Sequence, residues 1–189
     1  KLKLDYPFSQ YLVESAELNA DYSSLLEVFL DLVQRKVTPK EFCTAMNLQQ
    51  EAQLFEEFVN SVDANDFGKI IPEAEKQQLR DATEVLFSKL VKNSAAQKLL
   101  ASEFVNRMHG YKVIQPLLDD QELEEVMIQG LEPIFVFHAQ SGMCKTNLFF
   151  ESERDLREFL SQAGLTPGKL FEDGKLADGS RVNVLSPPA

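Results

Sequence analysis

The 189-residue chain has no tryptophan, only two histidines and two cysteines, and a deficit of positive charge. Its 19 lysines and arginines face 30 aspartates and glutamates, which gives a formal net charge of −11. Nucleic acid binding relies on clustered Lys and Arg, so this balance argues against nucleic acid as a partner. No apolar run reaches the roughly 18 residues that a membrane-spanning helix needs. Hydrophobic residues nevertheless make up 44% of the chain, which is ordinary for a packed protein.

Several motifs that carry chemistry are also missing. The eight glycines form neither GxGxxG nor GxxxxGK[ST], the two common phosphate-binding loops. Cys43 and Cys144 form no CxxC pair, and His109 and His138 have no metal-ligand spacing around them, so we expect reduced thiols and no metal site. A nucleophile pair of Cys144 and His138 is disfavoured, because nothing lowers the thiol pKa or forms an oxyanion hole.

Two acidic segments are candidate sites with simpler explanations. The loop that begins at Asp63 partly resembles a calcium-binding loop, but Phe67 and Ala74 occupy two positions that should carry ligands. A turn between helices is therefore favoured there. Asp119 and Asp120 are explained by a solvated turn that caps a helix, and no cleft residues accompany them.

The first half of the chain has apolar side chains at helical spacing, which predicts an all-helical bundle over residues 1–92. The apolar residues of its first helix are Leu25, Leu26, Phe29, Leu30, Leu32 and Val33. The residues expected to start or stop helices are Asp21, Thr38 with Pro39 and Glu41 in a capping box, Asn47, Pro72, Asn93 and Gly110.

The second half changes to the two-residue period of strands. Residues 125–129, 134–138 and 144–150 are predicted to form an antiparallel meander, followed by a helix that Ser152 caps. Two Asp-Gly turns are expected, at 173–174 and 178–179, before a last strand at 181–185. The predicted fold class is therefore α+β, with a small α+β domain over residues 93–189.

Arg181 is the most distinctive charged residue of this second domain. It follows the turn Asp178-Gly179-Ser180 and begins the last strand. A planar, permanently charged guanidinium on a fixed turn suits the recognition of a phosphate or carboxylate. A surface salt bridge is the alternative, since acidic residues are abundant, and from the residues alone this second explanation is favoured.

Four motifs in order between Gly110 and Pro188 resemble the N-terminal domain of the ATPases that drive type II secretion and type IV pilus or archaellum assembly, the archaeal branch above all. These motifs are Gly110-Tyr111 followed by Ile114–Asp120, Leu123–Gly130, Ile134–His138 with Thr146–Leu148, and Leu176–Val184 followed by Pro187-Pro188. The sequence departs from the family at Lys112, where many members have a second glycine, and at Ala177, where many have proline. The helical first half carries no motif of the family.

The resemblance implies a PAS-like fold for the second domain and a role without catalysis of its own. It identifies the chain as the N-terminal part of a hexameric ATPase, cut before a core domain that holds the Walker motifs and binds ATP and Mg²⁺. The chain itself would then carry no cofactor, and its domain would couple nucleotide state to motion. Arg181 matches a family arginine that reaches the nucleotide phosphates, with Asp178, Gly179 and Ser180 as its supporting turn.

The implied partners are the protein's own ATPase core, the neighbouring subunits of the hexamer, and a membrane platform protein docked on the helical half. The implied location is cytoplasmic, peripheral to the inner face of the cell membrane. A different class of function stays open: a stand-alone PAS-like sensor or protein-interaction module. A GxxxxGK[ST] loop in the gene beyond Ala189 would favour the ATPase, and a stop codon there would favour the module.

Overall fold

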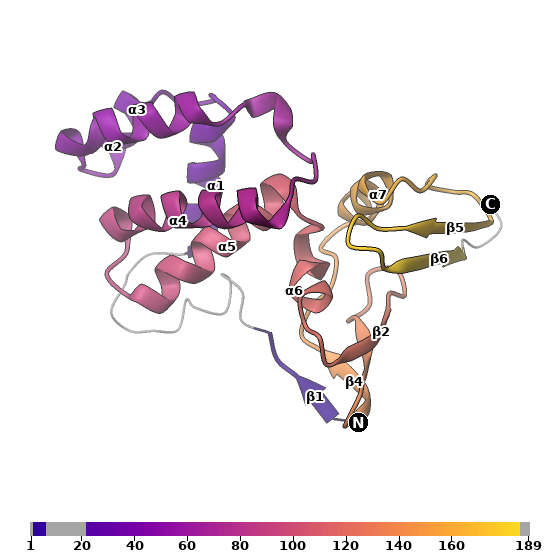
Figure 1. Ribbon diagram of the computed structural model, residues 1–189. Coiled ribbons are helices and arrows are strands. Elements are labelled where there is room, and N and C mark those ends of the chain that lie inside the picture. The colour runs from indigo at the N-terminus through magenta and orange to yellow at the C-terminus, as the bar shows by residue number, and fades with distance from the viewer. Residues whose placement is uncertain (1, 7–21, 186–189) are drawn as a thin grey trace. The chain divides into compact units, whose positions relative to one another are not determined.

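The computed structural model describes residues 2–6 and 22–185, which form a mixed α+β fold (Figure 1). The chain divides into two compact units, one made of Pro7–Gly110 and the other of Lys1–Tyr6 with Tyr111–Ala189. The predicted helix cap Asp21 and the terminal Pro187-Pro188 lie outside the described residues. Among the described helices, none combines the length and the apolar character needed to cross a membrane.

The unit Pro7–Gly110 is helical over its described residues. Short connections join its helices, and α4 and α5 pack along each other. The helices are α1 (Tyr22–Val33), α2 (Pro39–Ala45), η2 (Gln49–Glu51), α3 (Ala52–Ser61), η3 (Ala64–Asp66), α4 (Glu73–Leu90) and α5 (Ser94–His109).

Most of the helix boundaries follow the predicted caps. The Thr38 hydroxyl and the Glu41 carboxylate form the reciprocal capping box at the start of α2. The Asn93 side chain accepts hydrogen bonds from the first N–H groups of α5, and Gly110 ends that helix. Asn47 is the exception: it adopts a left-handed φ of 57° after α2 and does not cap α3. Asn tolerates this conformation, so Asn47 lies in the turn that follows α2 and does not start the next helix.

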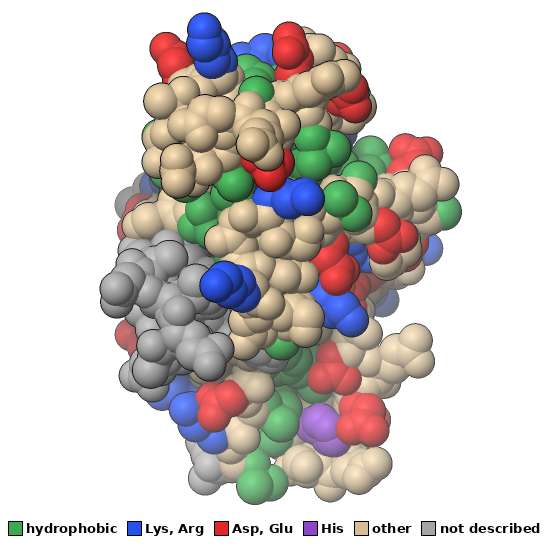
Figure 2. Space-filling model, turned by 90° about the vertical axis from the view of Figure 1, so that its left-hand side faces the viewer, with side chains coloured by type: hydrophobic (Ala, Val, Ile, Leu, Met, Phe, Trp, Pro, Cys, Tyr) green, Lys and Arg blue, Asp and Glu red, His purple; other side chains and the backbone are tan. Residues whose placement is uncertain are grey.

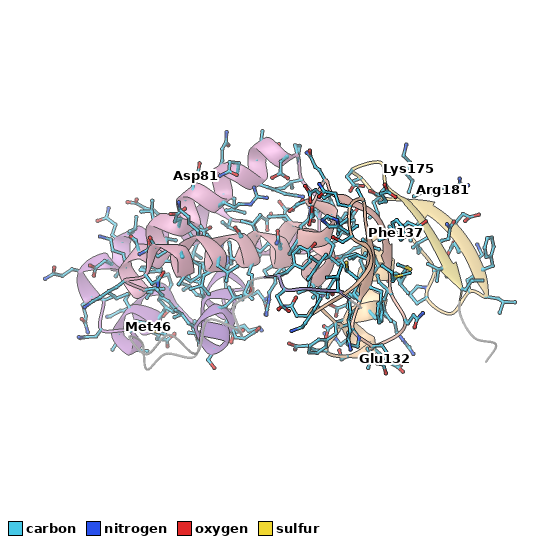
Figure 3. The ribbon with its side chains drawn as sticks, turned by 90° about the horizontal axis from the view of Figure 1, so that it is seen from below. Met46, Asp81, Glu132, Phe137, Lys175 and Arg181 are labelled. Atoms are coloured by element: carbon cyan, nitrogen blue, oxygen red, sulfur yellow. The ribbon has the colours of Figure 1, made fainter. Side chains whose placement is uncertain are left out.

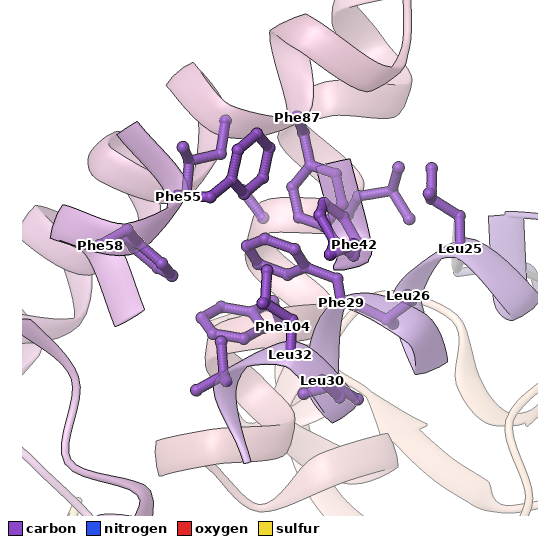
Figure 4. Close-up of a cluster of buried hydrophobic side chains, with 14 of the residues drawn as sticks. Leu25, Leu26, Phe29, Leu30, Leu32, Phe42, Phe55, Phe58, Phe87 and Phe104 are labelled. Atoms are coloured by element: carbon purple, nitrogen blue, oxygen red, sulfur yellow. The ribbon is translucent and has the colours of Figure 1, made fainter. Parts of the chain in front are cut away.

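The core of this unit is built around Phe29 of α1. Its ring centroid lies 4.8 Å from that of Phe87 and 5.1 Å from that of Phe104, and further phenylalanines close around it (Figure 4). All six apolar residues predicted for the first helix are buried. Phe29 therefore joins α1 to the helices that pack against it, and the spacing of the sequence predicted this face correctly.

The other unit contains a four-stranded sheet in the order β1-β4-β3-β2. Strands β2, β3 and β4 form the predicted antiparallel meander, whereas β1 pairs with β4 in parallel. The sheet is thus mixed, not purely antiparallel. The elements of this unit are β1 (Leu2–Leu4), η4 (Lys112–Ile114), α6 (Gln115–Leu118), β2 (Leu123–Met127), β3 (Phe135–His138), β4 (Gly142–Thr146), α7 (Glu153–Gln162), β5 (Phe171–Lys175) and β6 (Arg181–Leu185).

Strands β5 and β6 form a separate antiparallel hairpin, which corrects the prediction of two successive turns. The Asp178-Gly179 turn is present, but Asp173-Gly174 lies within β5. The reason is a close approach: a Cβ on Gly174 would lie 2.6 Å from Leu165 Cδ2. Glycine is needed here because the strand passes over a buried leucine, and the chain does not reverse.

The boundary between the units also differs from the expected one at residues 92 and 93. Helix α5 lies beyond that point but buries Leu100, Phe104 and Val105 in the helical core, so the division falls after Gly110. Residues Leu2–Tyr6 moreover belong with the sheet. The helical unit is therefore an insertion between the first strand of the α+β unit and the rest of that unit.

Candidate functional site

Arg181 is the first residue of β6 and pairs directly with Lys175, the last residue of β5. The two side chains lie on the outer face of the hairpin, where residues of both strands alternate between exposed and partly buried positions. Figure 3 labels both residues, and both side chains project from the hairpin. Two cations thus stand side by side at the end of the hairpin that carries the turn.

The turn before Arg181 is held by its own side chains. Ser180 donates from its backbone N–H to Asp178 Oδ1 at 2.8 Å and from its hydroxyl to Asp178 Oδ2 at 2.9 Å. Gly179 has a φ of +96°, which favours glycine. Both oxygens of the Asp178 carboxylate are therefore used within the turn.

The same turn is anchored to the rest of its unit. Leu176 is buried, and the backbone N–H of Ala177 donates to the Tyr111 hydroxyl at 3.0 Å. The buried Tyr111 ring meets Phe159 of α7 edge-on, with centroids 6.1 Å apart. These contacts fix the backbone before the turn that leads to Arg181. The guanidinium therefore moves mainly by rotation about its own side-chain bonds.

Arg181 and Lys175 make no ion pair with any carboxylate of the described residues. The salt bridge that the residues alone favoured for Arg181 is therefore not found there. Without a carboxylate partner in the described part of the chain, the charge of Arg181 is available to an anion from elsewhere. Figure 2 draws the protein from another side, and there acidic and basic side chains are mixed.

Two carboxylates in the same unit are already committed to other partners. The Thr166 backbone N–H and the Lys169 ammonium hold the pKa of the Glu172 carboxyl below its usual value. Lys112, followed by Arg154, has the same effect on the pKa of Glu158. Glu172 lies on the opposite face of β5 from Lys175, so it does not neutralise the cation pair.

The disfavoured nucleophile pair is not assembled. His138 Nε2 lies 2.8 Å from Glu122 Oε2, and His138 Nδ1 accepts the backbone N–H groups of Gln140 and Ser141. Cys144 is buried and donates to the Gly142 carbonyl. The hydrogen bonds of His138 thus shape the turn between β3 and β4. His109, at the end of α5 as predicted, contacts the Lys69 carbonyl through Nδ1 at 2.9 Å.

The candidate calcium loop is closed by contacts of its own side chains. Asp63 accepts from the backbone N–H of Asn65, and Asp66 pairs with Lys69. Within residues 2–6 and 22–185, no group of three or more His, Cys, Asp or Glu side chains could hold a metal ion.

The structure also reveals a set of contacts that sequence reasoning missed. Asp120 accepts the Tyr6 hydroxyl at 2.7 Å, while Asn147 exchanges two 2.8 Å hydrogen bonds with the Tyr6 backbone. Asp119 follows α6 and accepts from Gln115, so the two aspartates are structural, although they do not cap the start of a helix. Tyr6 lies 114 residues from Asp120 in the sequence, and no local pattern indicates such a contact.

Comparison with known proteins finds relatives in Methanocaldococcus jannaschii that are named as uncharacterized proteins. MJ1288 is 32% identical over 116 residues, which are 58% of this chain and 45% of that protein. MJ0781 is 40% identical over 73 residues, or 35% of this chain and 10% of that protein. MJ0900 is 32% identical over 78 residues, or 38% of this chain and 14% of that protein.

No protein-family model matches the chain. The chain spans less than half the length of each of these three relatives. In MJ0781 and MJ0900 the matching segment is a small part of a much longer protein, so sequence of this kind occurs within larger chains.

Proposed function

We propose that this chain is the non-catalytic N-terminal region of a hexameric ATPase of the secretion and pilus-assembly class. In this proposal the α+β unit is the PAS-like domain that couples nucleotide state to motion, and a core domain elsewhere in the protein binds ATP and Mg²⁺. Similar sequence makes up only a small part of MJ0781 and of MJ0900. This supports the proposal that the chain is part of a longer protein.

The observation that carries the proposal is the side chain of Arg181, which is exposed and unpaired within the described part of the chain. Its guanidinium is exposed, lies on an anchored turn and has no carboxylate partner among the described residues. Such a group can donate two parallel hydrogen bonds to a phosphate that another domain holds. It would stabilise the negative charge of that phosphate by position alone, with no proton transfer.

The proposed partners follow from the same assignment. The α+β unit would face the ATPase core and the neighbouring subunits, and the inserted helical unit would dock on a membrane platform protein at the inner face of the cell membrane. The insertion supports this division of roles, since the helical core is complete within its own unit.

The test is Arg181→Ala in the full-length protein, measured as ATP turnover and ATP affinity. Hydrogen bonds to charged groups contribute about 1.5–3 kcal/mol, so we expect turnover or affinity to fall by roughly ten- to a hundredfold. Lys145→Ala is the matched control: it removes another exposed cation of the same unit that lies on a different strand, β4. Unchanged affinity and turnover in the Arg181 variant would refute the proposed role.

A further inference from the structure

We infer that Lys175 and Arg181 together form a two-cation site for one phosphate group, such as the terminal phosphate of a nucleoside triphosphate. This inference rests on the proposed function and adds Lys175 as a second ligand of the same phosphate. It begins from the strand register, which places the two residues directly opposite each other at the end of the hairpin. Opposite residues in an antiparallel pair have Cβ atoms about 4.5–5.5 Å apart, close enough for two long cations to share one anion.

Most of the other cations in this part of the chain are paired with carboxylates. Between Tyr111 and Leu185, four of the other basic side chains have carboxylate partners: Lys112 and Arg154 pair with Glu158, Arg157 with Glu153, and Lys169 with Glu172. This part of the chain is acidic, so carboxylates are plentiful. Lys175 and Arg181 nevertheless have none within the described residues, although they are the two cations that lie next to each other.

Like charges that face each other across a strand pair destabilise the pair. An anion between the two cations removes that repulsion, so the free site favours an anion more than a single exposed cation does. Arginine offers a planar fork and lysine a point charge, a combination that suits a phosphate with several oxygens. The anchored turn keeps the two side chains in register, because Asp178 holds Ser180 and Tyr111 holds Ala177.

Asp173 opposes the site from the same face. It occupies the next outward position of β5 and pairs with Asn183, roughly 7 Å along the strand from Lys175. It makes no ion pair with either cation in the structure, but its charge weakens the positive potential at the site. Removing that charge should therefore strengthen phosphate binding, which supplies a variant with an effect of opposite sign.

The test is an NMR titration of this chain at pH 7 with sodium tripolyphosphate, followed at the backbone amides of Gly179, Ser180 and Arg181. We expect Lys175→Gln and Arg181→Gln each to weaken binding about three- to tenfold, and Asp173→Asn to strengthen it about twofold. The control Lys145→Gln should change the affinity less than about twofold, because Lys145 lies on β4 in the other sheet. Unchanged amide shifts elsewhere confirm that each variant is folded.

The outcomes separate this inference from the proposed function. If Arg181→Gln weakens binding and Lys175→Gln does not, the two-cation site is wrong and the role of Arg181 stands. If neither variant changes the affinity, the two-cation site is wrong, and the role of Arg181 is then decided by the ATP turnover and affinity of the full-length Arg181→Ala protein. An equal loss in Lys145→Gln would show binding by general charge and overturn the site, as would binding to phosphatidylglycerol vesicles without any response to tripolyphosphate.

Discussion

Tyr6 shows what a single residue contributes to the α+β unit. Three hydrogen bonds fasten it after the short strand β1, two to the Asn147 side chain and one to the Asp120 carboxylate. Strand β1 has only three residues, so the hydrogen bonds of Tyr6 add to the few contacts that attach this segment to the sheet. Burial and a hydrogen bond to a carboxylate both disfavour the charged phenolate, so they raise the pKa of a tyrosine.

The Tyr6 hydroxyl predicts a specific dependence of stability on pH. Burial, followed by the hydrogen bond to Asp120, raises the pKa of Tyr6 above its ordinary value of 10.0. The folded chain therefore keeps a proton that the unfolded chain loses, and the stability from this group is complete below about pH 10 and declines at higher pH. We expect Tyr6→Phe to cost about 1 kcal/mol at pH 7.

The measurement is urea unfolding of the wild-type chain and of Tyr6→Phe at pH 7 and at pH 10.5. The difference between the two proteins cancels the titration of other tyrosines and lysines. This difference should shrink at the higher pH, because only the wild type loses the contribution of the hydroxyl. A difference that stays constant or grows would contradict the assigned hydrogen bond.

At the scale of elements, the sequence predicted features that depend on neighbours in the chain and missed those that depend on contacts in space. The capping box of Thr38 and Glu41 and the buried face around Phe29 need only local spacing, and both were predicted correctly. Asp173-Gly174 has the composition of a turn, yet it lies within β5, where the glycine leaves room for Leu165. The pairing of Lys175 with Arg181 was missed for the same reason, since a turn at 173–174 leaves no strand there that could contain Lys175.

The contact between Gly174 and Leu165 predicts a double-mutant effect. Gly174→Ala places a methyl group 2.6 Å from Leu165 Cδ2, so the leucine must shift, and we expect the change to destabilise the chain by about 1–2 kcal/mol. In a Leu165→Ala background the same change should cost less than about 0.5 kcal/mol, because the obstructing side chain is gone. Thermal and urea unfolding of the four proteins measure both values.

Asp173→Ala serves as the control for this pair. It alters the neighbouring residue of β5 on the exposed face and should change the stability by less than about 0.5 kcal/mol. Equal costs of Gly174→Ala in the two backgrounds would mean that the glycine is needed for a reason other than Leu165.

For the whole molecule, the main finding is that the two units are nested and not consecutive. Strand β1 pairs with β4, which lies far along the sequence beyond the helical unit, so Pro7–Gly110 is inserted into the α+β unit. A three-residue strand gives almost no periodic signal, and its partner lies far along the sequence. The pattern of residues therefore predicted two kinds of structure correctly but not how the chain connects them.

The nested arrangement predicts that the α+β unit folds without the helical unit, provided that β1 is kept. The change is the replacement of Pro7–Gly110 by about twelve Gly and Ser residues, which span roughly 20 Å as a flexible chain. We expect this shortened chain to unfold cooperatively and to keep the phosphate response of Lys175 and Arg181. Under the proposed function it should also lose binding to the membrane platform protein, because the docking unit has been removed.

The matched control is the same shortened chain without its first six residues and the linker. It lacks the pairing of β1 with β4 and the three hydrogen bonds of Tyr6, so we expect it to be less stable by about 2 kcal/mol or more in urea unfolding. Equal stability of the two shortened chains would mean that β1 contributes nothing to the sheet and that the units are consecutive after all. A lower stability of the control would establish that β1, which precedes the helical unit in the sequence, is part of the α+β unit whose other strands follow the helical unit.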